Sequence, residues 1–270
     1  MKPAPFRYER PATLEAVLAL LDAHGAQAEI LAGGQSLMPM LALRVARPDL
    51  VIDINRIAGL GDITAIPDGG VRIGARARHA EVMASPLVPA LMRSALAHVA
   101  HPAIRNRGTL GGSLALADPA AEMPCCMVAL GARIVTLSSR GETHHDAASF
   151  FHGLYSTARR PDEMILRIEI PPLGPQWRFA FLEEARRLGD YAIAGVALAI
   201  GAGEVRLAFC GVEPAPRCLP ATEALILAGA DPLPGLVELA PMDSDDAPEA
   251  YRRHLAGVLL KRALREVGHG

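Results

Sequence analysis

Two short segments of the sequence combine a glycine pair with hydroxyl side chains. One is AGGQS at residues 32–36, and the other is TLGGS at residues 109–113. Backbone N–H groups converge on a phosphate most readily where no Cβ blocks the approach, and a serine or threonine adds a further donor. A single glycine pair is often only a turn, but two such segments indicate a diphosphate that is held from two sides.

A Rossmann dinucleotide site is the first alternative to this interpretation. Asp53 ends a predicted strand about 20 residues after the first glycines, which is where a ribose-binding acid would lie. The three-glycine fingerprint G-x-G-x-x-G is, however, absent from both segments. The glycine spacing therefore argues against a Rossmann site.

The elements that must position these segments indicate a mixed helix and strand chain. Apolar periodicity predicts helices at residues 13–24, 80–84, 87–99 and 123–130, strands at 29–32, 49–54, 70–74, 133–137 and 164–170, and a polar loop at 101–113. The consecutive prolines in PPLGP at 171–175 interrupt both helices and strands, so they mark the best domain boundary.

A smaller α+β domain is predicted beyond that boundary. Strands are expected at residues 177–183, 193–200 and 204–212, helices at 222–227 and 248–267, and a loop at 231–246, which is rich in proline and aspartate. Lys261, Arg262 and Arg265 lie in the last helix, whose charged face suits packing at a surface better than binding of nucleic acid.

Composition excludes several classes of function. Lys plus Arg total 27 and Asp plus Glu total 29 among 270 residues, so no general positive field recruits nucleic acid or an anionic membrane. No apolar run reaches the roughly 18 residues of a membrane span, and the start lacks the apolar segment of a signal peptide. We therefore expect no membrane span and a cytoplasmic location.

Metal and nucleophile chemistry find little support in the sequence. Cys125, Cys126, Cys210 and Cys218 match no metal or iron–sulfur spacing, so we expect free thiols. The histidine pairs 98/101 and 144/145 lack further ligands for a metal site, and neither glycine segment forms a G-x-S-x-G motif.

Four stretches in order along the chain resemble the FAD-binding medium subunit of the molybdenum hydroxylases, the family of carbon monoxide dehydrogenase and xanthine dehydrogenase. They are AGGQS at 32–36, IRNRGTLGGSLALADPAAEMP at 104–124, ARRLGDYAIAG at 185–195 and YRRHLAGVLLKRAL at 251–264. Their order across nearly the whole chain is more specific than either glycine segment alone.

The resemblance implies an α+β fold of two parts. Residues 1–173 would form an FAD-binding domain of the vanillyl-alcohol-oxidase (PCMH) type, with two α/β subdomains that divide near residues 55–60. Residues 174–270 would form a C-terminal domain with a three-stranded antiparallel sheet and helices, of the carbon monoxide dehydrogenase flavoprotein type.

The resemblance also implies the residues that bind FAD. In the family the two glycine segments hold the diphosphate, acidic residues lie near the cofactor, and one strand and one loop approach the flavin ring. Carried over to this sequence, the expected contacts are Ala32, Gly33, Gly34, Gln35, Ser36, Leu37, Thr109, Gly111, Gly112, Ser113, Asp118, Glu122, Ile165 and Tyr191. Glu122 is the candidate acceptor for ribose hydroxyls, because a carboxylate would repel the phosphates.

The function implied is electron transfer within a heterotrimer. A large molybdopterin subunit and a small subunit with two [2Fe–2S] clusters would be the partners, as a dimer of heterotrimers, and FAD would be the only redox cofactor in this chain. Electrons would leave the flavin for NAD⁺, a quinone, an electron-transfer protein or oxygen.

Two alternatives remain open from the sequence. One is a self-sufficient flavoenzyme of the same fold, like UDP-N-acetylenolpyruvoylglucosamine reductase, and the other is a non-enzymatic module that binds a phosphate ligand.

Overall fold

The N-terminal part of the chain is built on a small parallel sheet. The structure is a computed structural model that describes residues 2–268. Strands β1 (Arg7–Glu9), β3 (Leu50–Asp53) and β2 (Ala28–Leu31) lie side by side in that order. Around them lie the helices α1 (Leu14–His24) and α2 (Leu37–Ala42) and the short 3₁₀ helix η1 (Gly25–Gln27).

The sequence specifies both ends of helix α1. The Thr13 hydroxyl accepts a hydrogen bond from the N–H of Ala16, 3.3 Å away, and caps the first turn. Gly25, at φ +48°, ends the helix in a conformation that few other residues adopt. Val17 and Leu21 bury the inner face against the sheet.

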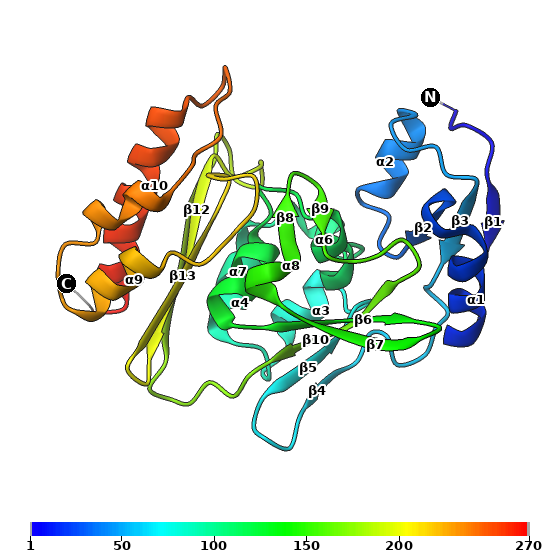
Figure 1. The fold of residues 1–270 in the computed structure, drawn as a ribbon, viewed down its shortest axis with the longest axis horizontal. Helices are drawn as coiled ribbons and strands as arrows, with labels where there is room; N and C mark the ends of the chain where they lie inside the picture. The colour runs from blue at the N-terminus through cyan, green and yellow to red at the C-terminus, as the bar shows by residue number, and fades with distance from the viewer. Residues whose placement is uncertain (1, 269–270) are drawn as a thin grey trace.

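The central part is a five-stranded antiparallel sheet covered by helices (Figure 1). The strands run in the order β4 (Ile63–Ala65), β5 (Val71–Gly74), β10 (Met164–Ile170), β6 (Arg133–Ser138) and β7 (Gly141–Asp146). The other elements here are α3 (His79–Ala84), α4 (Ala90–His98), α5 (Pro102–Arg105), α6 (Leu110–Leu116), α7 (Glu122–Leu130), α8 (Ala147–Phe150), β8 (Phe151–Gly153) and β9 (Ser156–Thr157).

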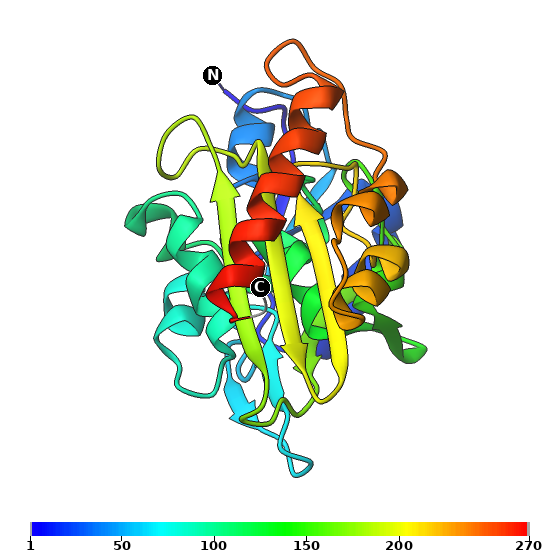
Figure 2. The same cartoon turned by 90° about the vertical axis from the view of Figure 1, so that its left-hand side faces the viewer.

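The C-terminal part is a three-stranded antiparallel sheet that is buried on both faces. Its strands are β11 (Arg178–Glu184), β12 (Ala194–Gly201) and β13 (Glu204–Cys210), followed by α9 (Pro220–Leu227), the 3₁₀ helix η2 (Leu233–Glu238) and α10 (Glu249–Glu266). Figure 2 shows α10 lying across one face of this sheet. Alternate residues of β12 join different cores, since Val196 and Leu198 pack with α10 while Ala197 packs with α7.

Two segments that we predicted to be loops contain helices. Within 101–113, residues 102–105 form α5, and the glycine pair lies in the first turn of α6. Within 231–246, residues 233–238 form η2. The predicted helix at 87–99 begins only at Ala90, because Pro89 precedes its first turn.

The structure shows no helix in residues 2–268 that is both long and apolar enough to cross a membrane.

Candidate functional site

The first glycine segment forms the connection between β2 and α2. Gly34 has φ +72°, and the side chain of Gln35 donates from Nε2 to the carbonyl oxygen of Gly33 at 3.1 Å. In the described part of the chain, the backbone N–H groups of residues 33–37 donate no hydrogen bond. The turn therefore presents a row of unpaired donors at the start of a helix, which is the arrangement that binds an anion.

The turn is fixed to its surroundings through Asn55, which follows strand β3. Asn55 donates from Nδ2 to the carbonyl oxygen of Ala32 at 2.8 Å. The guanidinium of Arg78 donates to Oδ1 of Asn55 at 2.6 Å and also to the carbonyl oxygen of Arg107. A Cβ on Gly33 would overlap that same carbonyl oxygen of Arg107. The structure thus places the first glycine segment against residues 107–108, directly before Thr109.

The second glycine segment differs from our prediction, because it is helical and its donors are occupied. The Thr109 hydroxyl caps α6 by accepting from the N–H of Gly112 at 3.1 Å. The N–H of Gly111 donates to the carbonyl oxygen of Ala75 at 2.8 Å. A Cβ on Gly111 would lie 2.6 Å from that of Ala75, so the glycine is required by packing. The free donors here are the hydroxyl groups of Thr109 and Ser113.

Arg78 and Arg107 lie at this junction, and Arg76, whose guanidinium lies against Gly61, is close enough to add to its positive charge. Burial lowers the pKa of Arg78, and the nearby cations of Arg76 and Arg107 lower it further. The Nε atom of Arg76 is buried and has no hydrogen-bond partner among the described residues. A guanidinium group without an acceptor and a row of free N–H groups both fit a ligand with a negatively charged diphosphate, as in FAD.

A second group of predicted residues gathers at the other end of α6. Asp118 follows this helix, and its Oδ2 accepts a hydrogen bond from the hydroxyl of Tyr155 at 3.3 Å. Tyr155 has φ +52°, an uncommon conformation for an aromatic residue that often marks a functional loop. These two residues line a pocket of about 420 Å³ with the exposed Tyr191 and with Arg186 and Asp190. One helix thus links the glycine junction to an open pocket.

Glu122 lies behind this pocket as the first residue of α7. It is buried, and burial raises the pKa of its carboxyl group to about 7, with a further contribution from the negative charge of Glu183. Ile165 does not reach either region. Its side chain is in the hydrophobic core beneath α6 and α7, and Met164 joins the core around α1. The structure therefore brings Glu122 toward Asp118 and Tyr191 but leaves Ile165 in a packing position.

Sequence reasoning missed three residues of this region, and the structure supports its rejection of a Rossmann role for a fourth. Asn55 was detectable, because polar side chains at the carboxyl ends of parallel strands often bind ligands. Nothing in the sequence indicated the roles of Arg78 or Tyr155. Asp53, which we weighed as a ribose-binding acid, accepts hydrogen bonds from Tyr8 and Asn55 and pairs with Arg10. Its oxygens are therefore engaged within the protein.

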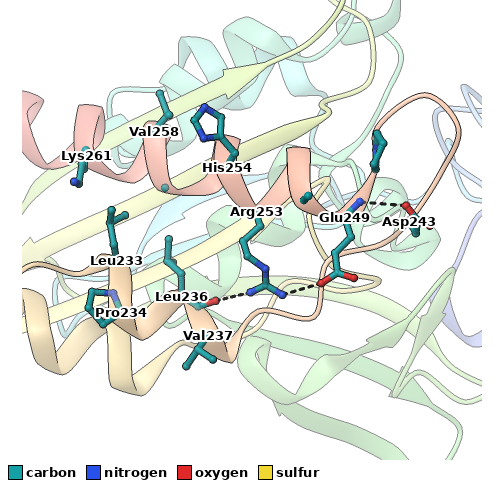
Figure 3. Close-up of a pocket in the computed structure, with 13 residues that line it drawn as sticks. Leu233, Pro234, Leu236, Val237, Asp243, Glu249, Arg253, His254, Val258 and Lys261 are labelled. Atoms are coloured by element: carbon teal, nitrogen blue, oxygen red, sulfur yellow. Dashed lines mark hydrogen bonds and ion pairs between the residues drawn. The ribbon is translucent and has the colours of Figure 1, made fainter.

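A larger cavity lies far from the glycine junction, in the C-terminal part (Figure 3). It measures about 1010 Å³ and lies between η2 and α10. Arg253 spans it, donating to the carbonyl oxygens of Leu236 and Leu239 and to Oε1 of Glu249 at 2.9, 3.0 and 3.0 Å. Its charged side chains have partners within the protein, since Arg253 pairs with Glu249, Asp243 accepts from the N–H of Glu249, and Lys261 pairs with Asp231.

Within residues 2–268, no three histidine, cysteine, aspartate or glutamate side chains are grouped so as to hold a metal ion. All four cysteines are free thiols, and three of them are buried.

Comparison with known proteins identifies close similarity over the whole chain. Residues 4–173 match the family model described as the FAD binding domain in molybdopterin dehydrogenase. The caffeine dehydrogenase subunit beta of Pseudomonas sp. (strain CBB1) is 38% identical, over 98% of this chain and 95% of that protein. The nicotine 6-hydroxylase medium subunit of Paenarthrobacter nicotinovorans is 37% identical, over 100% of this chain and 94% of that protein.

Solved structures give the same result. A carbon monoxide dehydrogenase of Hydrogenophaga pseudoflava superposes with a TM-score of 0.92 at 32% identity and covers 99% of each chain. A quinoline 2-oxidoreductase of Pseudomonas putida 86 superposes with a TM-score of 0.91 at 34% identity, over 100% of this chain and 99% of that one.

Proposed function

We propose that this chain, which belongs to the FAD-binding subunits of the molybdenum hydroxylase family, transfers electrons from a partner's iron–sulfur clusters to an external acceptor. The subunits of this family are parts of oxidoreductase complexes. The observation that supports this proposal most strongly is the row of unpaired N–H groups at residues 33–37, beside Arg76, Arg78 and Arg107.

The proposed binding site follows α6 from end to end. The turn at residues 32–37 holds the diphosphate through its backbone N–H groups, with the Gln35 side chain keeping the turn in shape. Thr109 and Ser113 add hydroxyl donors, while Gly111 and Gly112 allow the helix to begin close to the turn. Asp118 and Glu122 accept hydroxyl hydrogen bonds from the sugar portions, and Tyr191 borders the flavin ring, while Ile165 supports the site only from the core beneath α6.

The bound FAD supplies a ring system that accepts and releases electrons singly or in pairs. The protein's part is to bind, to orient and to exclude water. Tyr155 and Tyr191 border the pocket at the far end of α6, where they cover apolar surface and leave the opening through which an acceptor approaches. No side chain of this chain has to act as an acid, a base or a nucleophile on a substrate.

The proposed partners are a large molybdopterin subunit and a small subunit with two [2Fe–2S] clusters, in a dimer of heterotrimers. The printed names of the relatives as subunit beta and medium subunit support a multi-subunit assembly. FAD is proposed as the only redox cofactor of this chain. The proposed location is the cytoplasm, which the four free thiols favour.

The proposed domain division places residues 1–173 in a two-subdomain FAD-binding domain of the PCMH type, divided near residues 55–60, and residues 174–270 in a separate α+β domain. Three distinct sheets support this division, since one ends at Asp53, the next includes residues 63–170 and the last begins at Arg178.

Purification of the native complex tests this proposal. We expect the chain to co-purify with a molybdopterin subunit and an iron–sulfur subunit, and to release one FAD per chain on denaturation. We also expect its flavin absorption to decrease when the pre-reduced iron–sulfur subunit is added. A monomer that alone oxidises NADPH with a sugar nucleotide would contradict the proposal and favour the self-sufficient flavoenzyme.

A further inference from the structure

Three titratable side chains from three elements influence one another electrostatically near the pocket that Tyr155 and Tyr191 border. Glu122 begins α7, Glu183 lies on β11, and His98 lies in the last turn of α4. Nδ1 of His98 is 3.4 Å from Oε1 of Glu183, whose side chain is only 4% exposed. The other carboxylate oxygen of Glu183 is buried and has no hydrogen-bond partner among the described residues. We call these three residues the buried acid cluster.

The cluster has more acids than it has cations to balance them. Among the described residues, His98 is the only basic side chain within ion-pair distance of either carboxylate. A buried carboxylate without a full set of partners is costly to ionise. The pKa of Glu122 is accordingly raised to about 7 by burial and by Glu183, and the hydrogen bond that His98 donates to Glu183 raises the pKa of His98. The cluster therefore gains or loses a proton near neutral pH.

The surroundings do not supply a compensating charge. Strand β12, which pairs with β11, carries no titratable side chain. The titratable groups that act on the cluster from neighbouring elements are Asp118, Tyr191, Cys125, Cys126 and Cys210. None of them is a cation, so none stabilises an ionised carboxylate, and the negative charge of Asp118 raises the pKa of Glu122 further. The aromatic ring of Phe181, 5.5 Å from that of His98, excludes water from one side.

We propose that Glu122, Glu183 and His98 together hold one exchangeable proton, and that the cluster takes up a proton from solvent when the flavin bound beside it is reduced. This inference rests on the proposed function, since it needs FAD near Tyr191. The electron pair enters the flavin from the reductant. Besides any proton that the flavin itself takes, one proton comes from bulk water and forms an O–H bond on the carboxylate of Glu122, and no bond of the protein chain is broken.

The physical reason is electrostatic coupling in a water-poor region. Added electron density on a nearby ligand raises the proton affinity of a buried carboxylate, because the low local dielectric weakens screening. By reciprocity, a proton on the cluster favours reduction of the flavin. Glu183 acts through Glu122 and is therefore a positioning residue. His98, which is partly exposed, gives the cluster a route to solvent.

Redox titration of the FAD-loaded chain over a pH series tests the proposal. In the wild type, the midpoint potential should fall with pH most steeply around the pKa of the cluster, which is about 7 for Glu122. E183Q removes the charge that raises the pKa of Glu122, so the steep region should move to lower pH. H98Q removes the charge that lowers this pKa, so the steep region should move to higher pH. E184Q, an exposed neighbour on β11, is the matched control and should follow the wild type.

A second readout is the infrared difference spectrum between the reduced and oxidised chain. The wild type and E184Q should gain the carbonyl band of a protonated carboxylic acid on reduction, and E183Q should not gain it near neutral pH. Absence of flavin absorption in the purified wild-type chain would overturn the proposed function itself. Normal FAD content, with the same potential profile in the wild type, E183Q and H98Q, would overturn only the proton proposal.

Discussion

Gly33 and Gly111 are glycines because the protein's own atoms occupy the space of a side chain. A Cβ on Gly33 would overlap the carbonyl oxygen of Arg107, and one on Gly111 would lie 2.6 Å from the Cβ of Ala75. Substitution at either position would therefore report on packing before it reported on ligand binding. The groups that are free of such a constraint, and that the proposal assigns to the ligand, are the N–H groups of residues 33–37 and the hydroxyl of Ser36.

His79 makes stability depend on pH, because it lies buried directly behind the second glycine segment. Both of its ring nitrogens lack partners among the described residues, and burial lowers its pKa to about 4 from an ordinary value of 6.5. The unfolded chain binds the proton more tightly, so stability is complete above about pH 6.5 and falls as the pH decreases toward 4. The loss attributable to His79 is about 3 kcal/mol.

Urea unfolding of the wild type and H79L across this range measures the effect. The stability difference between them should shift in favour of H79L by that amount as the pH falls. H144Q, at an exposed histidine, serves as the control and should track the wild type. Glu122, whose pKa is raised, has the opposite dependence in an overlapping range, but it is common to all three proteins and cancels in the comparison. A difference that is constant with pH would contradict this account of His79.

Helix α6 is the element that joins the two halves of the proposed site. Its first turn packs against the carbonyl oxygens of Ala75 and Ala77, and Asp118 lies just beyond its last turn. The Thr109 hydroxyl is the side-chain group that fixes the start of the helix. Any loss at this cap therefore disturbs both the glycine junction and the pocket.

T109V should destabilise the chain by about 1–2 kcal/mol, because valine keeps the shape of threonine but leaves the N–H of Gly112 without its acceptor. T109S retains the hydroxyl acceptor and loses only a buried methyl group, so its loss should be about 0.8 kcal/mol and smaller than that of T109V. Urea denaturation at one pH measures both variants. Equal stability of T109V and the wild type would show that the cap contributes nothing.

Particular elements show what local sequence could and could not reveal. Thr13, Gly25 and the apolar spacing between them fully define α1. The helix at 110–116 was missed because two adjacent glycines are poor helix formers, and only contact with Ala75 explains their presence there. Strand β7 was missed because GETHHD lacks apolar alternation. It is an edge strand whose side chains are largely exposed, and its pairing with β6 defines it.

The site, too, was predictable only where it depends on local sequence. The turn at 32–37 is local, so the glycine pattern located it. The link to residues 107–108 through Asn55 and Arg78 depends on contacts between segments that are far apart in the sequence. Residue patterns within one segment cannot predict such contacts. The exposed side chain of Tyr155 and its left-handed backbone likewise follow from the pocket it borders.

At the scale of the whole molecule, three sheets frame a route from the glycine junction to the pocket beside the C-terminal part. Figure 1 shows α2 and α10 at opposite ends, with the central sheet and α6 between them. The N–H of Gly211, which follows β13, donates to the carbonyl oxygen of Pro119 at 2.7 Å and ties the C-terminal sheet to the loop after α6. The C-terminal part thus closes one side of the pocket, which suits a junction between electron donor and acceptor.

The central claim is that the turn at residues 32–37 holds the diphosphate of FAD, and calorimetric titration of the apo chain tests it most directly. FAD should bind about a hundredfold or more tightly than riboflavin, which lacks the diphosphate, and ADP should compete where adenosine does not. S36P, which removes one N–H of the turn, should weaken FAD binding roughly tenfold or more, whereas S36A should retain most of the affinity. Equal affinities for FAD and riboflavin, with no competition by ADP, would contradict the account.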